Sequence, residues 1–114
     1  MEIQPTERDD GITQVALVGR LDMLGLHQIE LKFQGYTAAR RMPTIVDLSK
    51  LDLITSLGLG MLIAAFKALD RCGAKMVLLN PLGMVDLVLR TAKIEEIIPV
   101  VATLEEAVAR VRPA

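Results

Sequence analysis

Thr55 and Ser56 are the residues of this sequence that are best placed to do chemistry. They stand in the stretch 47–60, where a predicted strand leads through a loop into the clearest predicted helix. A helix N-terminus has unpartnered backbone N–H groups and a partial positive charge, so it accommodates an anion. A phosphate on Ser56 would add about −1.5 to −2 charges there without necessarily unfolding the helix. Ser56 is therefore a candidate phosphorylation site, at which added charge would block a docking partner while the fold persists.

A purely structural role accounts for the same two hydroxyls. Ser and Thr side chains cap helices by accepting hydrogen bonds from the free N–H groups of the first turn. Gly58 and Gly60, which follow at once, carry no side chain that would crowd either a cap or a phosphate. The residues alone leave both interpretations open.

Other kinds of site find little support. The chain has one cysteine, Cys72, and one histidine, His27, which excludes a zinc site built from Cys and His and an intrachain disulfide. His27 lies in a predicted helix and does not suggest a catalytic triad. Gly58-Leu59-Gly60 lacks the further glycine or the Gly-Lys-Ser/Thr of nucleotide-binding loops. We therefore predict a binding module without cofactor rather than an enzyme, and a buried or half-buried free thiol at Cys72.

Composition narrows the class of partner and the location. The 114 residues carry 13 basic and 14 acidic side chains, a net charge of −1, with only 3% aromatic residues. Nucleic-acid binding typically needs a basic stripe, and the densest basic cluster here is Arg40-Arg41. No apolar run approaches the roughly 20 residues that span a bilayer, and residues 1–5 do not resemble a signal peptide. We expect one domain over 1–114 in the cytoplasm, with no nucleic-acid partner and no membrane span.

Strands and amphipathic helices alternate along the chain. A short extended piece around Ile3-Gln4 and a turn at 9–11 precede the first clear strand. Strands are then predicted at 12–18, 44–48, 76–79 and, at an edge because of Pro99, 97–100. Helices are predicted at 24–41, 58–71 with Gly73 as C-cap, around 85–92, and from Thr103, where Thr103 and Glu106 match a capping box. This order predicts an α/β fold, with a mixed sheet of four to five strands and about four helices packed on it.

The predicted fold gathers several polar residues at one end of the sheet. Asp22, Ser56 and the pair Asn80-Pro81 all follow predicted strands, and binding sites of parallel sheets lie beyond the strands' carboxyl ends. We therefore expect a shared surface made by Asp22, Thr55, Ser56, Leu57, Gly58 and Met61. Asp47 either belongs to this region or holds its loop from within.

The stretch Leu51–Ile63, Leu-Asp-Leu-Ile-Thr-Ser-Leu-Gly-Leu-Gly-Met-Leu-Ile, resembles the STAS domain (sulfate transporter and anti-sigma factor antagonist). Members of its anti-anti-sigma branch carry Asp-Ser-Ser/Thr-Gly-Leu-Gly here, and their phosphate-accepting serine falls on Ser56. Gly19-Arg20-Leu21-Asp22, Asp47-Leu48-Ser49 and Thr103–Ala107 resemble further family segments, so that the likeness covers nearly the whole chain.

The resemblance implies partner switching. The unphosphorylated protein would bind an anti-sigma factor, often a serine kinase, and so release a sigma factor. The kinase would end the interaction by phosphorylating Ser56, and a phosphatase would reset it. In the family, the aspartate matched by Asp22 lies near the serine and contributes to the partner surface.

Two departures from the family pattern flank Ser56. Thr55 replaces the usual Asp, which removes a negative charge and makes Thr55 a second candidate acceptor, and Leu57 replaces a small or polar residue. The alternative is a STAS scaffold without the kinase cycle, as in a stressosome-like or lipid-transport complex. The sequence does not decide between a monomer and a dimer.

Overall fold

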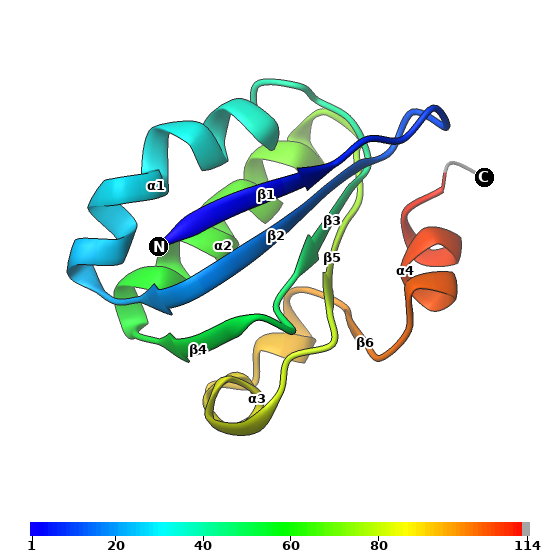
Figure 1. The fold of residues 1–114 in the computed structure, drawn as a ribbon. Helices are drawn as coiled ribbons and strands as arrows, with labels where there is room; N and C mark the ends of the chain where they lie inside the picture. The colour runs from blue at the N-terminus through cyan, green and yellow to red at the C-terminus, as the bar shows by residue number, and fades with distance from the viewer. Residues whose placement is uncertain (113–114) are drawn as a thin grey trace.

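The computed structural model describes residues 1–112 and has a mixed β-sheet covered by helices on both faces. Helices α1 (Met23–Tyr36) and α2 (Ser56–Arg71) cover one face, and α4 (Leu104–Val111) packs on the other (Figure 1). A further helix, α3 (Gly83–Thr91), packs against the short strand β4 (Leu51–Ile54). The predicted α/β class and the mixed sheet with four helices are confirmed.

The sheet has six strands, in the order β1-β2-β3-β5-β6, with β4 beside the end of β2. The remaining strands are β1 (Glu2–Thr6), β2 (Thr13–Leu21), β3 (Thr44–Asp47), β5 (Met76–Leu79) and β6 (Val100–Val101). Among the strands within residues 1–112, β1 alone is antiparallel to its neighbour, as expected for the predicted N-terminal hairpin. Strands β2 to β6 run parallel, so the loops that follow them emerge at one edge.

Strand β4 lies in a stretch that the sequence pattern predicted as a link. The Asp47 carboxylate accepts a hydrogen bond from the Ser49 backbone N–H at 2.9 Å, and this turn redirects the chain. As a result β3 pairs with the first half of β2, and β4 pairs with its last residues. Of the two roles considered for Asp47, the structure shows the one that holds the loop.

Two predicted helix boundaries are corrected. α1 ends at Tyr36 rather than Arg41, because the Thr37 hydroxyl donates to the Phe33 carbonyl oxygen at 2.7 Å and closes the last turn. α2 begins two residues earlier than predicted, at Ser56. At its other end Gly73 has a φ of +77°, the left-handed conformation expected of a glycine that terminates a helix.

The predicted last strand does lie at the edge of the sheet, as β6, but its predicted bounds, 97–100, are wrong. A short 3₁₀ helix at Ile94–Glu96 (η1) precedes it, and β6 comprises only Val100 and Val101. Ile98 is fully buried, while Pro99 has no N–H to give to a ladder and offers only its carbonyl oxygen, to Leu78 N at 2.9 Å. At the final helix, Thr103 accepts from Glu106 N at 3.2 Å, as the predicted capping box requires.

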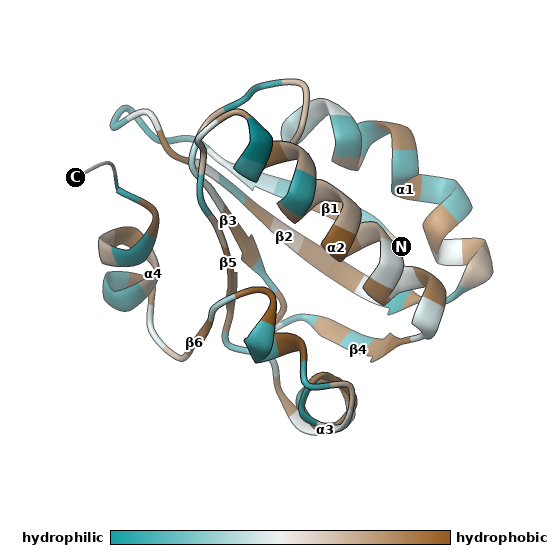
Figure 2. Ribbon diagram, turned by 180° about the vertical axis from the view of Figure 1, so that it is seen from behind, coloured by the Kyte–Doolittle hydropathy of each residue, from teal (hydrophilic) through white to brown (hydrophobic). Residues whose placement is uncertain are grey.

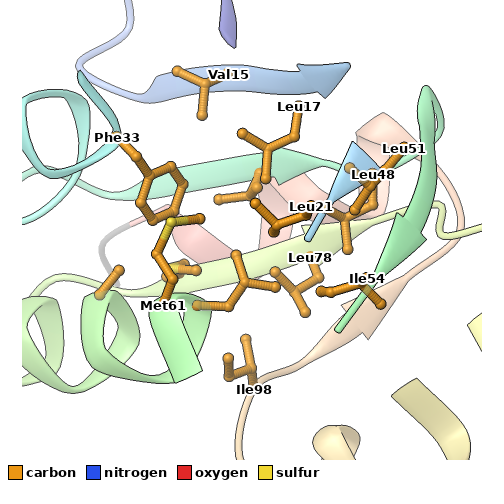
Figure 3. Packing of buried hydrophobic residues seen from close by; sticks show 14 of the residues in the cluster. Val15, Leu17, Leu21, Phe33, Leu48, Leu51, Ile54, Met61, Leu78 and Ile98 are labelled. Atoms are coloured by element: carbon orange, nitrogen blue, oxygen red, sulfur yellow. The ribbon is translucent and has the colours of Figure 1, made fainter. Parts of the chain in front are cut away.

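The core has two parts, one on each face of the sheet. Val15, Leu17 and Leu21 of β2 point toward Phe33 of α1 and Met61 of α2 (Figure 3). On the other face a smaller cluster joins Ile45, Val77, Leu79, Ala107 and Val111. Figure 2 shows the hydrophobic colour along the inner strands, as expected for parallel strands buried on both sides.

Cys72 lies at the end of α2 and is exposed, so the prediction of a buried or half-buried thiol is wrong. The helix has already ended there, and the residue projects from the turn rather than from the apolar stripe. Within residues 1–112 none of the helices has the length and apolarity that crossing a membrane requires.

Candidate functional site

Two strand-to-helix connections are adjacent, one at Asp22 between β2 and α1 and the other at Thr55 between β4 and α2. We call them the two corners, and hydrogen bonds join them. Leu21 and Ile54 are paired in the parallel ladder, so Asp22 and Thr55 follow neighbouring strands, which lie about 4.8 Å apart. The backbone N–H and the hydroxyl of Thr55 both donate to the carbonyl oxygen of Leu21, each at 3.1 Å. The start of α2 is thereby held against the start of α1.

Asp22 is the N-cap of α1. Its Oδ1 accepts a hydrogen bond from Gly25 N at 2.8 Å, and its backbone carbonyl accepts from Leu26 N at 2.8 Å. Its second carboxylate oxygen lies 3.8 Å from Arg20 Nε. The side chain is half-buried, so Asp22 fixes the start of α1 and still leaves part of its carboxylate accessible beside the Thr55 corner.

Two glycines allow these helix starts to pack tightly. A Cβ on Gly25 would lie 2.0 Å from the carbonyl oxygen of Arg20, and a Cβ on Gly58 would lie 2.7 Å from the Leu21 side chain. Gly58 is buried, so its place in the predicted partner surface is corrected to a packing role beneath it. Gly25 was missed by the sequence interpretation, although a glycine three residues after a capping aspartate was a usable signal.

Ser56 is exposed and is the first residue of α2. Thr55 occupies the N-cap position but makes no side-chain cap bond, because its hydroxyl is turned to Leu21. The first helical hydrogen bond runs from Leu59 N to Thr55 O at 3.0 Å, and the first turn has no acidic residue. α2 therefore differs from α1 and α4, whose N-termini are capped by Asp22 and Thr103.

Exposed apolar side chains lie at the same edge of the sheet as Ser56. Leu57 is 49% exposed, and Met23 and Leu24 at the start of α1 are 62% and 68% exposed. Three further exposed apolar residues, Leu82, Met84 and Leu87, belong to the start of α3. Such side chains gathered at one edge are typical of an interaction surface. The sequence interpretation identified only Leu57, although the others lie outside the buried helical stripes and could have been recognised on that ground.

Met61 does not lie on this surface, contrary to the prediction. Its side chain is 8% exposed and packs against Phe33 in the core (Figure 3). Residues 56 and 61 are five positions apart, which turns them to different sides of a helix. The loop at Asn80-Pro81 also emerges at this edge, but β5, which it follows, is separated from β2 by β3.

A metal site is not indicated within residues 1–112, because nowhere in that range do three or more His, Cys, Asp or Glu side chains gather as ligands. The Ser56 corner instead offers an exposed hydroxyl, the uncapped N–H groups of a helix, and exposed apolar side chains at the same edge. This combination suits a surface that binds a protein and tolerates an anion.

Comparison with known proteins connects this fold to a family. The structure resembles an anti-sigma factor antagonist from Mycobacterium paratuberculosis, with a TM-score of 0.81, 23% identity, and coverage of 98% of this chain and 96% of that one. It also resembles the anti-sigma factor antagonist SpoIIAA in its unphosphorylated form, with a TM-score of 0.74, 23% identity, and coverage of 96% and 95%. The phosphorylated form of the Bacillus cell fate determinant SpoIIAA gives a TM-score of 0.66, 26% identity, and coverage of 97% and 100%.

Comparison with curated protein sequences gives no match. The model of the STAS domain, in contrast, matches residues 4–107, which include both corners, all six strands except the first residues of β1, and the first half of α4. The chain therefore belongs to the STAS domain family.

Proposed function

We propose that this protein is an anti-sigma factor antagonist whose partner surface is switched by phosphorylation of Ser56. The observation that carries the proposal is the exposed Ser56 hydroxyl at an uncapped helix N-terminus, next to exposed Leu57 and at the same edge as exposed Met23 and Leu24. Structural neighbours that are anti-sigma factor antagonists support the general role, and one of them is known in a phosphorylated form.

Ser56 is a better acceptor than Thr55. The Thr55 hydroxyl is half-buried and donates to the Leu21 carbonyl oxygen, so modifying it would break the bond that joins the two corners. Ser56 is exposed and lies outside that bond. A kinase active site therefore reaches the Ser56 oxygen without unfolding the corner, and we assign the phosphate to Ser56.

The physics of the switch follows from the surroundings of that oxygen. A phosphoryl group on Ser56 would lie next to the uncapped N–H groups of α2, which stabilise negative charge. A partner that covers Leu57, Met23 and Leu24 would have to strip water from this dianion, at a high cost in free energy. Phosphorylation would thus prevent docking and leave the fold intact.

The proposed partners follow from this cycle. An anti-sigma factor with serine kinase activity would transfer the γ-phosphoryl group of its nucleoside triphosphate to Ser56 Oγ, and a phosphatase would hydrolyse the resulting ester. The protein itself acts as a binding module and performs no catalysis. We place the cycle in the cytoplasm, where sigma factors act.

The decisive experiment combines modification with binding. The protein is incubated with candidate anti-sigma kinases, and mass spectrometry locates the phosphate, which we expect on Ser56 and not on Thr55. The Ser56→Asp variant should fold and bind the anti-sigma partner at least tenfold more weakly than wild type, while Ser56→Ala should bind normally. Absence of phosphate with every cognate kinase would disprove the switch.

A second candidate function is a STAS scaffold without a kinase cycle. Thr55 favours it, because Thr replaces the acidic residue that precedes the acceptor in switched relatives, and its hydroxyl is committed to Leu21. Equal partner affinity of Ser56→Asp and wild type would select this role.

A further inference from the structure

A groove of about 500 Å³ lies between the second half of α1 and the central turns of α2. Figure 2 views this side of the molecule, where the two helices run next to each other in front of the sheet. Phe33 and Met61 contribute to the buried floor of the groove, and Ala64 and Ala68 of α2 lie along one wall. Because alanine side chains are short, the space between the helices stays open.

Leu31 of α1 lines the same groove and is 83% exposed, more than any other large apolar side chain in residues 1–112. A partner that covers Leu31 and the alanine wall removes apolar surface from water, which favours association. The groove therefore suits the apolar stripe of a partner, and the charges beside the groove decide which kind of partner it is.

Two basic side chains of α2 stand beside the groove. Lys67 is three residues after Ala64, so the two are neighbours on the surface of the helix. Arg71, in the last turn of α2, stands in the same relation to Ala68. Both basic side chains are exposed, and neither forms an ion pair within residues 1–112. Asp70 does not offset them here, because it is about 240° around the helix from Ala64 and so faces away from the groove.

The other charged groups near the groove leave this positive end unopposed. α1 and α2 follow neighbouring parallel strands and run in the same direction. Glu30 is the first residue of α1 that lines the groove, so its carboxylate belongs to the end away from Arg71. The guanidinium of Arg40 lies over the Tyr36 ring, 5.1 Å from its centre, and lines a different cavity. Positive charge is therefore concentrated beside the last turns of α2.

We propose that this helical groove, lined by residues within 30–39 and 61–68, docks an acidic amphipathic helix of a partner protein. Apolar side chains of the docked helix cover Leu31 and the alanine wall, and its carboxylates lie beside Lys67 and Arg71. Amphipathic helices bind hydrophobic grooves in this way, with apolar side chains at every third or fourth position. A hollow between two helices suits such an occupant better than the flat surface of a membrane.

The helical groove is separate from the Ser56 corner. Ala64 is eight residues after Ser56, which places it about 12 Å further along α2. A helix in the groove leaves the start of α2 accessible. The proposal is therefore independent of the proposed phosphorylation of Ser56 and is tested on unmodified protein.

A pair of synthetic peptides tests the charge of the occupant. The first is a short amphipathic helix with leucines along one side, glutamates on the other and one tryptophan, whose fluorescence is seen alone because the protein has no tryptophan. The second carries lysines in place of the glutamates. The acidic peptide should bind the wild-type protein at least tenfold more tightly than the basic peptide. Equal affinities, or a preference for the basic peptide, overturn the proposal.

Matched charge reversals locate the binding. Lys67→Glu combined with Arg71→Glu should weaken binding of the acidic peptide at least tenfold. Lys32→Glu combined with Arg110→Glu changes the net charge by the same amount and should bind like wild type. Arg110, like Arg71, is the basic residue in the last turn of its helix, and Lys32 is about 200° around α1 from Glu30. Losses of equal size in the two double variants would reveal unspecific attraction and overturn the proposal.

The apolar part of the contact has its own test. Leu31→Ser should weaken the acidic peptide at least threefold, whereas Leu104→Ser, at an exposed leucine of α4, should leave its affinity unchanged. Circular dichroism melts check that every variant is folded. Amide chemical shifts that move on binding should fall within 30–39 and 61–71. Shifts confined to other faces, or binding to phosphatidylserine vesicles without binding to the peptide, overturn the proposal.

Discussion

Thr55 donates two hydrogen bonds, one from its backbone N–H and one from its hydroxyl, to the single carbonyl oxygen of Leu21. These bonds explain why Thr55, the N-cap residue of α2, does not cap its own helix, since its hydroxyl already donates to the Leu21 carbonyl oxygen. It also fixes the position of Ser56, the next residue, relative to Asp22, the next residue after Leu21. The geometry of the candidate site thus depends on a contact made by the residue in front of the acceptor.

Thr55→Val should destabilise the protein by about 1 kcal/mol, because it removes the hydroxyl bond and keeps the shape of the side chain. The Leu21 carbonyl oxygen keeps its bond from the Thr55 backbone, so it is not left without a partner. Urea unfolding measures the change. Thr55→Ser retains the hydroxyl and should lie closer to wild type, and equal stability of all three proteins would refute the role of the bond.

Gly25→Ala should destabilise the fold by about 3 kcal/mol or more. A Cβ at this position would lie 2.0 Å from the carbonyl oxygen of Arg20, so either the corner or the first turn of α1 must shift. Gly35, in the same helix, is the matched control because a Cβ there meets nothing within 4 Å. Gly35→Ala should stabilise the protein by about 0.5–1 kcal/mol through helix propensity. Thermal melts of the two variants should move in opposite directions.

Much of the fold could be predicted from the sequence because its signals are local. The β-branched runs, the helical stripe of α2, Gly73 and the Thr103 cap each specify one element by nearby residues. β4 was missed because Leu51–Ile54 becomes a strand only through pairing with the far end of β2, a contact that no local pattern encodes. The sequence pattern predicted the partner strand only to residue 18, whereas β2 continues to Leu21, and the residues of that extension pair with β4.

In the candidate site, too, features encoded by nearby residues could be predicted, whereas features that depend on tertiary contacts could not. The corner at Ser56 was recognised from its hydroxyls and glycines, which are local features. The burial of Met61 and Gly58 depends on where the helix axis lies relative to β2, and spacing along the chain does not fix that. The exposed apolar side chains at the starts of α1 and α3 could not be assigned to the same edge as Ser56 without the topology that brings three helix starts there.

Asp10 should titrate unusually low. Hydrogen bonding from the Arg8 guanidinium, with Arg8 Nη2 2.5 Å from Asp10 Oδ2, lowers the pKa of this carboxyl from 3.8 to about 2. Because the folded-state pKa is depressed, the contribution to stability is present above pH 3.8 and is lost as the pH falls through 2. Carbon-detected NMR titration of the carboxyl measures the midpoint. Arg8→Gln should return the pKa of Asp10 toward its ordinary value, and an unchanged midpoint would exclude Arg8 as the cause.

Ser56→Asp should raise the stability of the unphosphorylated fold rather than lower it. The first turn of α2 contains no acidic residue, and Thr55 leaves its N–H groups uncapped, so a carboxylate at position 56 meets an uncompensated positive helix end. Favourable charge at such a position contributes about 0.3–1 kcal/mol and is screened by salt. Ser56→Asn is the uncharged control of similar size. Urea unfolding at low and high salt should show that the free energy of unfolding of Ser56→Asp exceeds that of Ser56→Asn at low salt and that the difference shrinks at high salt.

Stabilisation by the Ser56→Asp change combined with weaker partner binding would separate the two effects of a charge at residue 56. The charge would stabilise the fold and at the same time make the apolar surface around Leu57 costly for a partner to cover. A less stable Ser56→Asp would mean that the negative charge acts by disrupting α2, which is a different mechanism of switching.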